Sequence, residues 1–294
     1  MKAKSLYAAL SQLFDIKTPL DDWEMQNKKY LTGTFKNGKQ KDMGVMVDNA
    51  KIINKVYTAT FLTSEVVNLL KKRNEKNALV FVHHPKDWDI ERLRQGGELF
   101  TELTDLDYKF LMQNAISVYV AHQPLDNNRS EININKSLAS AIGIEIVKNH
   151  LVYYKGASLG VICKTNGTLG SLRKQFEKAI GHKSFLQNFG GSRILDGLVA
   201  IVGGGGNDVE IYRKLVEHGV NTYITGVVNW ETGFQPAVDA AKYAKAKKIN
   251  IIAGTHYSTE KFGLIDMVKY FEKLGLQAEF VEQKPKFSDY TFKL

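Results

Sequence analysis

Apolar positions follow two different periods along this chain, and the switch between them predicts an α/β fold. Short apolar runs rich in β-branched and aromatic residues, such as 78–82 and 222–225, are typical of buried strands. Leu6, Leu10 and Phe14 recur at a spacing of four and predict one buried helix face over 5–14. Because strand and helix patterns alternate to the end of the chain, largely parallel or mixed sheets are expected.

The predicted elements can be placed by residue number. Strands are predicted over 50–58, 78–82, 118–121, 157–163, 197–202, 222–225, 249–254 and 278–282. Helices are predicted over 5–14, 64–73, 99–114, 131–141, 169–179, 208–218, 236–247 and 258–274, and a hairpin over 28–41. Ser64 and Ser258 are the expected N-caps of their helices. With 294 residues, two interlocked α/β lobes are expected, 1–125 with 253–294 and 126–252.

Composition excludes several classes of protein. The chain has 44% hydrophobic and 24% charged residues, as ordinary globular proteins do. A single cysteine, Cys163, excludes an intramolecular disulfide and a thiolate-rich zinc site. No window approaches the roughly 18 apolar residues of a spanning helix, and the first residues lack the apolar core of a signal peptide. We therefore expect a cytoplasmic protein that does not contact membranes.

The net charge of +9 raises the question of nucleic-acid binding. The lysines are scattered over separate turns and helices, and no segment interleaves basic with aromatic residues as single-strand binders do. A basic surface that attracts a small anionic substrate, or a solvated lysine-rich face, explains the charge equally well. Nucleic-acid binding is therefore the third-ranked interpretation of the charge, and nucleic acid is a less favoured partner than a small anionic or nucleotide ligand.

Ligand-type side chains follow three of the predicted strands. Four of the seven histidines and two carboxylates at four-residue spacing share this position: His83 and His84, His122 with Asp126, and His256 with Glu260. In α/β folds, ligands bind at the carboxyl ends of strands. Imidazole and carboxylate together suit zinc, iron or manganese, and the lack of thiolate argues against a purely structural zinc site. The pattern predicts a metal site with more than one ion.

For any single histidine at a strand end, the alternative to a metal ligand is a polar side chain exposed to solvent at the edge of the sheet. His150, His182 and His218 take that interpretation, because no carboxylate follows them at ligand spacing in a comparable context. Four histidines at strand ends with matched carboxylates favour the metal site.

Four consecutive glycines, Gly203 to Gly206, follow one predicted strand and open a helix. That context suits phosphate binding by backbone N–H groups. The run lacks the third glycine of a dinucleotide fingerprint, and no Lys-Ser/Thr follows as in a P-loop. A tight turn with close backbone packing is the favoured interpretation, and a phosphate contact is the alternative.

Five motifs together resemble the NIF-three-like family, whose members are also called GTP cyclohydrolase 1 type 2 homologs. They are His-His-Pro at 83–85, Ala-His-Gln-Pro-Leu-Asp at 121–126, Val-Ala-Ile-Val-Gly-Gly at 199–204, Tyr-Ile-Thr-Gly at 223–226 and Gly-Thr-His-Tyr-Ser-Thr-Glu-Lys at 254–261. Their order and spacing fit over nearly the whole chain. The last motif is specific only in combination with the histidine pair.

The resemblance implies two α/β lobes around a central dinuclear metal site, and a toroidal homohexamer. It implies two divalent ions, zinc, iron or manganese, held by His83, His84, His122, Asp126, His256 and Glu260. This chain departs from the family in two places. The loop 227–232 lacks the usual acidic residue and histidine, with Glu231 as a substitute at best, and the turn 86–89 is polar. Asp87 and Asp89 could reach the metals, but an exposed acidic turn is favoured.

Two divalent ions bridged by a carboxylate are typical of a hydrolase active site. Asp126 is the expected bridging ligand, and Glu260 is expected as a terminal ligand or as the catalytic general base. The first hypothesis is a metal-dependent hydrolase of a nucleotide or other phosphorylated small molecule, with GTP ring opening as the reaction that the family label suggests. The alternative is a non-enzymatic, metal-stabilised ring that serves as a scaffold, a metal chaperone or a protein- or DNA-binding module.

Overall fold

The computed structural model describes residues 1–14, 44–154, 157–229 and 235–290. The chain forms two compact units, 1–125 with 264–283 and 126–263 with 284–294. The predicted hairpin at 28–41 and Glu231 lie outside the described residues. Within the described ranges, every helix is too short or too polar to cross a membrane. The lobe boundaries expected from the sequence stay a prediction.

The sheet of unit 1 has five strands in the order β1-β6-β3-β2-β15. These are β1 (Gly44–Val47), β2 (Lys55–Phe61), β3 (Ala78–His84), β6 (Ser117–Val120) and β15 (Gln277–Phe280). β1 is antiparallel to β6 and the other neighbouring pairs are parallel, so the sheet is mixed. Val82 pairs with Val120, and the carboxyl ends of β3 and β6 therefore lie at the same edge.

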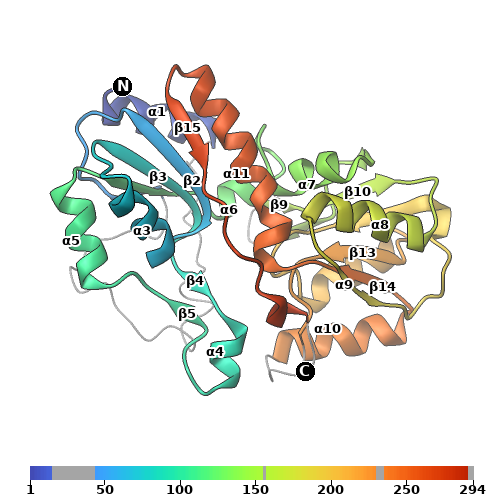
Figure 1. Ribbon diagram of the computed structural model, residues 1–294. Coiled ribbons are helices and arrows are strands. Elements are labelled where there is room, and N and C mark those ends of the chain that lie inside the picture. Colours follow the sequence, from blue (N-terminus) through green and yellow to red (C-terminus); the bar gives the residue numbers. More distant parts are fainter. Residues whose placement is uncertain (15–43, 155–156, 230–234, 291–294) are drawn as a thin grey trace. The chain divides into compact units, whose positions relative to one another are not determined.

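Helices cover both faces of this sheet (Figure 1). They are α1 (Ala3–Leu13), α3 (Ser64–Lys72), α5 (Asp105–Gln113) and the C-terminal half of α11 (His256–Lys273). The apolar sides of α3 and α5 pack on one face. On the other, the Phe81 ring stacks on Phe14 after α1 and meets Phe271 of α11 edge-on. Each such buried ring stabilises the fold by about 1.5–3 kcal/mol.

The helix predicted over 99–114 begins later than expected. Residues 87–101 instead form a short hairpin of β4 (Asp87–Trp88) and β5 (Phe100–Thr101) around α4 (Ile90–Arg94). Helix α5 starts at Asp105 because Thr104 and Asp107 form a capping box. Their side chains accept hydrogen bonds from the N-terminal backbone N–H groups, which would otherwise lack partners. In the same way Thr63, not the expected Ser64, caps α3.

The sheet of unit 2 has six strands in the order β11-β14-β13-β12-β10-β7. They are β7 (Glu145–Lys148), β10 (Val161–Lys164), β11 (Phe185–Gln187), β12 (Leu198–Ile201), β13 (Thr222–Thr225) and β14 (Asn250–Ala253). β12, β13 and β14 are parallel to one another, and the other pairs are antiparallel. A separate hairpin joins β8 (Val152–Tyr154) to β9 (Ala157–Leu159). The strand predicted over 157–163 is thus two strands, separated at Gly160, which has a φ of +68°.

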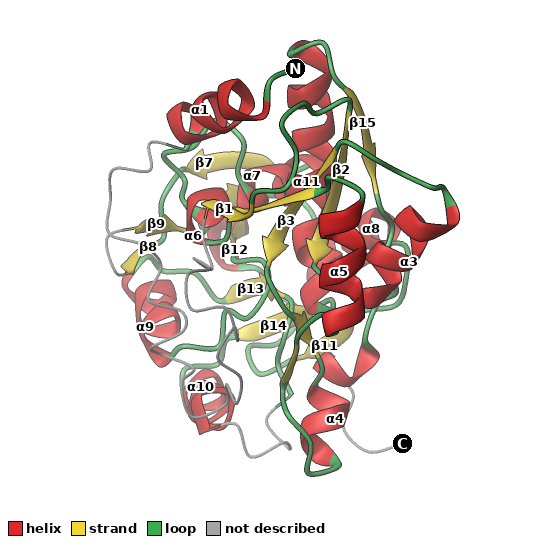
Figure 2. Ribbon diagram, turned by 90° about the vertical axis from the view of Figure 1, so that its left-hand side faces the viewer, coloured by secondary structure: helices red, strands yellow, loops and turns green. Residues whose placement is uncertain are grey.

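Four helices enclose this second sheet (Figure 2). They are α7 (Ile134–Ile142), α8 (Leu169–Ile180), α9 (Val209–Glu217) and α10 (Gln235–Ala246), and short turns η2 (Leu195–Gly197) and η3 (Phe287–Asp289) complete the unit. α9 and α10 pack on one face, against residues such as Tyr223 and Ile251. α7 and α8 pack on the other, against Ile224 and Ile252. Adjacent strand residues thus bury opposite faces, as strand geometry requires. The α/β fold with mixed sheets is confirmed.

Candidate metal centre

Three histidines form a tight group at the carboxyl edge of the first sheet. His83 and His84 end β3, and His122 follows β6, the parallel neighbour of β3. The ring centroids of His83 and His84 lie 4.3 Å apart, and those of the two rings lie 4.9 and 4.7 Å from the His122 ring. One nitrogen from each ring lies within 4.8 Å of those of the other two, close enough to hold a metal ion.

The hydrogen bond of His83 determines which of its nitrogens can bind a metal. Its Nδ1 lies 3.0 Å from the carbonyl oxygen of Ala121, and the side chain is fully buried. A carbonyl oxygen only accepts hydrogen bonds, so Nδ1 carries the proton and Nε2 holds the lone pair. Metal-binding histidines are commonly oriented by such a bond to a backbone carbonyl. His84 is oriented differently, because its ring stacks on Phe61 at a centroid distance of 4.8 Å.

In unit 2, the first five residues of α11 carry a buried His/Glu pair. The Nε2 of His256 lies 3.1 Å from the Oε1 of Glu260. Both residues are buried, with 6% and 3% of their surface exposed. Residues four apart lie on the same face of a helix, which explains the predicted spacing. An imidazole nitrogen and a carboxylate oxygen held this way form a pair of ligand atoms suited to a divalent ion.

The start of α11 differs from the prediction. The helix begins at His256, not at Ser258, because the hydroxyl of Thr255 accepts the backbone N–H of Ser258 at 3.1 Å. The carboxylate of Asp289 accepts the backbone N–H of His256 at 2.8 Å. Glu260 therefore lies in the second turn of the helix, beyond the first turn in which it was expected.

The glycine turn after β12 packs directly against this His/Glu pair. Gly204 has a φ of +68°, and a Cβ added to it would overlap the Oε1 of Glu260 and lie 3.1 Å from the Nε2 of His256. Its backbone N–H donates to the hydroxyl of Thr259 at 2.9 Å. Its carbonyl accepts the N–H groups of Gly226 and Val227, each at 3.0 Å. The favoured interpretation, a tight turn with close backbone packing, therefore describes Gly204.

The remaining predicted residues lie in several environments. Asp126 is half-buried and ends the short helix α6 (Gln123–Asp126), one helical turn after His122. Its role as bridging ligand stays a prediction. Asp87 lies in β4 and Asp89 caps α4, and both are half-buried, so the acidic turn is not exposed. The buried ammonium group of Lys86 pairs with Glu102 at 2.6 Å.

The three other histidines belong to unit 2 and serve in hydrogen bonds. His150 Nδ1 lies 3.0 Å from Ser158 Oγ, and both ring nitrogens of His218 lie within 3.5 Å of Lys148 Nζ. His182 contacts Ser258, at a distance of 2.6 Å from Nε2 to Oγ. Burial lowers the pKa of His150 and of His182 below the usual value of histidine.

Sequence reasoning missed two residues that shape the His/Glu pair. Gly204 was assigned to a turn, and nothing local indicated that its missing side chain makes room for a carboxylate. Asp289 was not considered at all, because its partner His256 lies 33 positions away in the chain. The only local signal for Gly204 is its place within a four-glycine run.

The fold and these side chains define an α/β protein with two mixed sheets and buried His/Glu groups that could hold metal ions. A model of the Duf34/NIF3 (NGG1p interacting factor 3) family matches residues 30–286, and the chain belongs to this family. The resemblance inferred from the motifs is thereby confirmed.

Curated relatives and solved structures agree with this assignment. Proteins named "GTP cyclohydrolase 1 type 2 homolog" from Archaeoglobus fulgidus and Borreliella burgdorferi are each 27% identical, over 81% of this chain and 88% and 87% of theirs. The crystal structure of Staphylococcus aureus protein SA1388 has a TM-score of 0.67 at 18% identity, covering 100% of this chain and 99% of its own. Reduced HcgD from Methanocaldococcus jannaschii has a TM-score of 0.65 at 18% identity, covering 96% and 98%. The structural likenesses establish the shared fold.

Proposed function

We propose that this protein binds two divalent metal ions and hydrolyses a nucleotide or another phosphorylated small molecule. The proposed ligands are the six side chains named from the motifs: His83, His84, His122, Asp126, His256 and Glu260. The observation that carries the proposal is the presence of a three-histidine group in unit 1 and a buried His/Glu pair in unit 2, built from imidazole and carboxylate without thiolate. The division between the two units falls within helix α11, whose first residues carry His256 and Glu260.

The chemistry of the donor atoms fits a divalent ion. The Nδ1 proton of His83 is held by Ala121, which leaves Nε2 as a lone-pair donor. Nitrogen and oxygen ligands of this kind suit zinc, iron or manganese. A bound divalent ion would supply Lewis acidity and a more acidic bound water, both of which promote hydrolysis at neutral pH.

Glu260 has the position of a group that can both bind and accept a proton. Its carboxylate is buried and oriented by His256 at 3.1 Å, and Gly204 leaves room for it. A general base must lie within hydrogen-bond reach of the proton that it removes. We therefore keep Glu260 as the catalytic residue of the proposed reaction.

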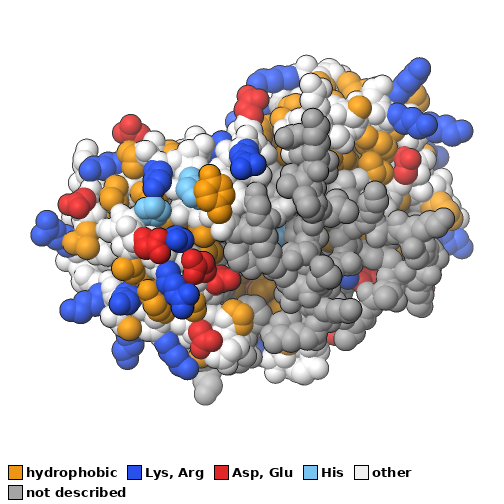
Figure 3. All heavy atoms as spheres, turned by 180° about the vertical axis from the view of Figure 1, so that it is seen from behind, with side chains coloured by type: hydrophobic (Ala, Val, Ile, Leu, Met, Phe, Trp, Pro, Cys, Tyr) orange, Lys and Arg blue, Asp and Glu red, His pale blue; other side chains and the backbone are white. Residues whose placement is uncertain are grey.

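The proposed substrate class rests on charge and on the relatives. The net charge of +9 favours an anionic ligand. The curated relatives are named for a GTP cyclohydrolase, and this makes GTP the first nucleotide to test. On the face in Figure 3, basic side chains are scattered among acidic ones over the described surface and form no single stripe. Nucleic acid remains the lower-ranked partner, and a cytoplasmic homohexamer remains the expected state.

The test begins with metal loading. Protein purified without chelator is expected to contain about two divalent ions per chain by elemental analysis. The metal-replete protein is then screened with GTP and other nucleotides, and product is measured by chromatography. Glu260→Gln should lower kcat by about 10²–10⁴-fold, the usual contribution of a general base, because glutamine keeps the size but accepts no proton.

The control is the fold of the Glu260→Gln variant, which should keep the wild-type oligomer and melting temperature. Unchanged turnover in this variant would reject the base role. Metal-replete wild type that turns over no nucleotide would instead favour the scaffold or metal-chaperone hypothesis, and absence of metal after reconstitution would reject the proposal as a whole.

A further inference from the structure

The C-terminal segment of the described chain holds the first residue of α11. Asp289 is 1% exposed, and its Oδ2 accepts the backbone N–H of His256 at 2.8 Å. The first N–H groups of a helix have no partner within the helix, so this carboxylate acts as a cap from a distant part of the chain. A negative charge at the helix N-terminus also interacts favourably with the helix dipole. Asp289 thus caps the first residue of α11, in addition to the cap that Thr255 provides.

Asp289 is itself fixed by the loop after β13. Its carbonyl oxygen accepts the backbone N–H groups of Val228 and Asn229, at 2.9 and 3.0 Å. The side-chain amide of Asn229 donates to the carbonyl of Ser288 at 2.6 Å. Three hydrogen bonds therefore tie η3 to this loop, and the carboxylate is presented to His256 from a defined position.

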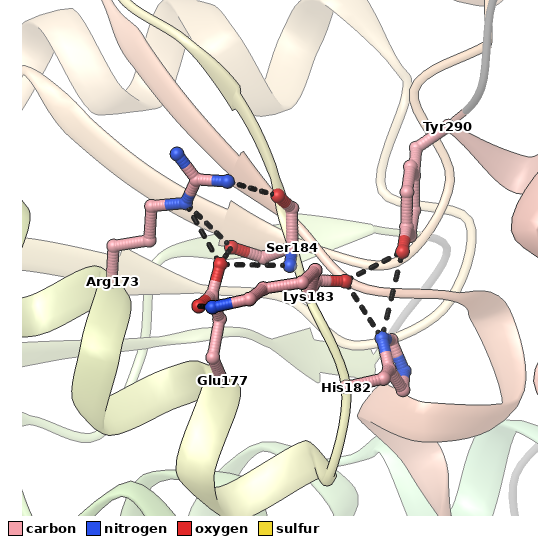
Figure 4. A network of polar contacts seen from close by, with 6 residues as sticks. All are labelled: Arg173, Glu177, His182, Lys183, Ser184 and Tyr290. Atoms are coloured by element: carbon pink, nitrogen blue, oxygen red, sulfur yellow. Dashed lines mark hydrogen bonds and ion pairs between the residues drawn. The ribbon is translucent and has the colours of Figure 1, made fainter.

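The next residue anchors the segment on the turn after α8 (Figure 4). The Tyr290 hydroxyl donates to the carbonyl of Lys183 at 2.6 Å, and that carbonyl also lies 2.8 Å from His182 Nδ1. Nδ1 is then the protonated nitrogen, so Nε2 accepts a hydrogen bond from the hydroxyl of Ser258, at 2.6 Å. His182 thus contacts α11 at Ser258, two residues after the residue that Asp289 caps.

The turn that carries His182 and Lys183 is rigidly braced. Glu177 accepts hydrogen bonds from the backbone N–H and the hydroxyl of Ser184, both at 3.0 Å, and pairs with Arg173 and Lys183. Burial alone would raise the pKa of Glu177, but these hydrogen bonds and charges outweigh it and lower the pKa to about 2. The carboxylate therefore stays ionised, and the turn is a firm support for Tyr290.

We infer that Asp289 is a positioning residue for the metal centre: it holds His256 through its backbone, with Tyr290 as the anchor of the segment. The inference rests on the proposed metal binding and deepens it. His256 and Glu260 lie in the five residues that follow this cap, so a shift at the first residue would move the imidazole against the carboxylate 3.1 Å away. Supporting residues of this kind commonly change metal affinity by about 10–100-fold.

The experiment compares Asp289→Ala with Asp289→Asn in the full chain. Zinc affinity is measured by competition with a chromophoric chelator, and the visible spectrum of the cobalt form reports ligand geometry. The alanine variant should bind zinc at least about tenfold more weakly and shift the cobalt bands. The asparagine variant keeps an acceptor oxygen at the same place, and should stay within about threefold of wild type.

A matched control separates positioning from ordinary helix capping. Thr168 caps α8 through its hydroxyl, which accepts the backbone N–H of Ser171 at 3.2 Å. Thr168→Ala should lower the melting temperature and leave zinc affinity and the cobalt spectrum unchanged. If Asp289→Ala behaves like Thr168→Ala, Asp289 is a structural cap only and the inference is overturned.

Two further measurements keep the inference testable. Tyr290→Phe removes only the hydroxyl that binds Lys183, so it should weaken zinc binding less than Asp289→Ala does. This variant provides the test if Asp289→Ala does not fold. Unchanged zinc affinity in Tyr290→Phe would count against the role of Tyr290 as anchor. In metal-free protein, the NMR signals of the His256 ring should shift in Asp289→Ala and not in Asp289→Asn. That readout separates the two proposals: wild type that binds no metal rejects the proposed function, whereas unchanged His256 signals reject positioning.

Discussion

His84→Ala is expected to lose at least half of its bound metal, from about two ions per chain to about one or fewer. The imidazole of His84 lies in the buried group with His83 and His122, at centroid distances of 4.3 and 4.7 Å. Removing it takes one nitrogen ligand away, and alanine cannot replace it. Elemental analysis after dialysis against chelator-free buffer measures the loss.

The variant also removes a ring that stacks on Phe61, so a loss of packing must be separated from a loss of ligand. His84→Phe keeps an aromatic ring at that place and has no nitrogen, and it should lose metal as His84→Ala does. His218→Ala is the matched control, because His218 lies at the end of α9 and its ring contacts Lys148. Equal metal content in all three variants and wild type would show that the ligand assignment is wrong.

Gly204→Ala is expected to reduce metal affinity by at least about tenfold without replacing any of the proposed ligand residues. A Cβ at this position would overlap the Oε1 of Glu260 and lie 3.1 Å from the Nε2 of His256. The carboxylate would have to swing away from His256, because the glycine backbone is tied to Thr259, Gly226 and Val227 and has little freedom to move. Zinc affinity by chelator competition measures the effect.

The backbone conformation of Gly204 contributes a separate cost. A left-handed φ of +68° costs a residue with a side chain about 1–2 kcal/mol. Gly219→Ala is the matched control, since Gly219 has a φ of +67° and nothing within 4 Å of an added Cβ. Both variants should lose stability to denaturant, and only Gly204→Ala should lose metal affinity. Equal affinity in the two variants would mean that Glu260 tolerates the added methyl group.

The sequence by itself determined the class of fold and the inventory of candidate ligands. Periodicity located most helices and strands, because apolar spacing records which face of an element is buried. It located β13 at 222–225 to the residue and α8 to within one. The histidines and carboxylates could be recognised as candidate ligands because they follow predicted strands. The carboxyl ends of neighbouring parallel strands meet at one edge of a sheet, where ligands bind.

Only the tertiary structure decided how those side chains are held. The proton on His83 Nδ1 follows from Ala121, which comes directly after a different strand, β6. The first turn of α11 is capped by Asp289 as well as by the neighbouring Thr255, and local N-cap statistics cannot see Asp289 because it is 33 positions from His256. The need for glycine at position 204 is seen only in the tertiary structure, where Glu260 lies beside it. Local pattern reports burial, whereas hydrogen-bond partners and steric limits at the site depend on contacts between residues far apart in the chain.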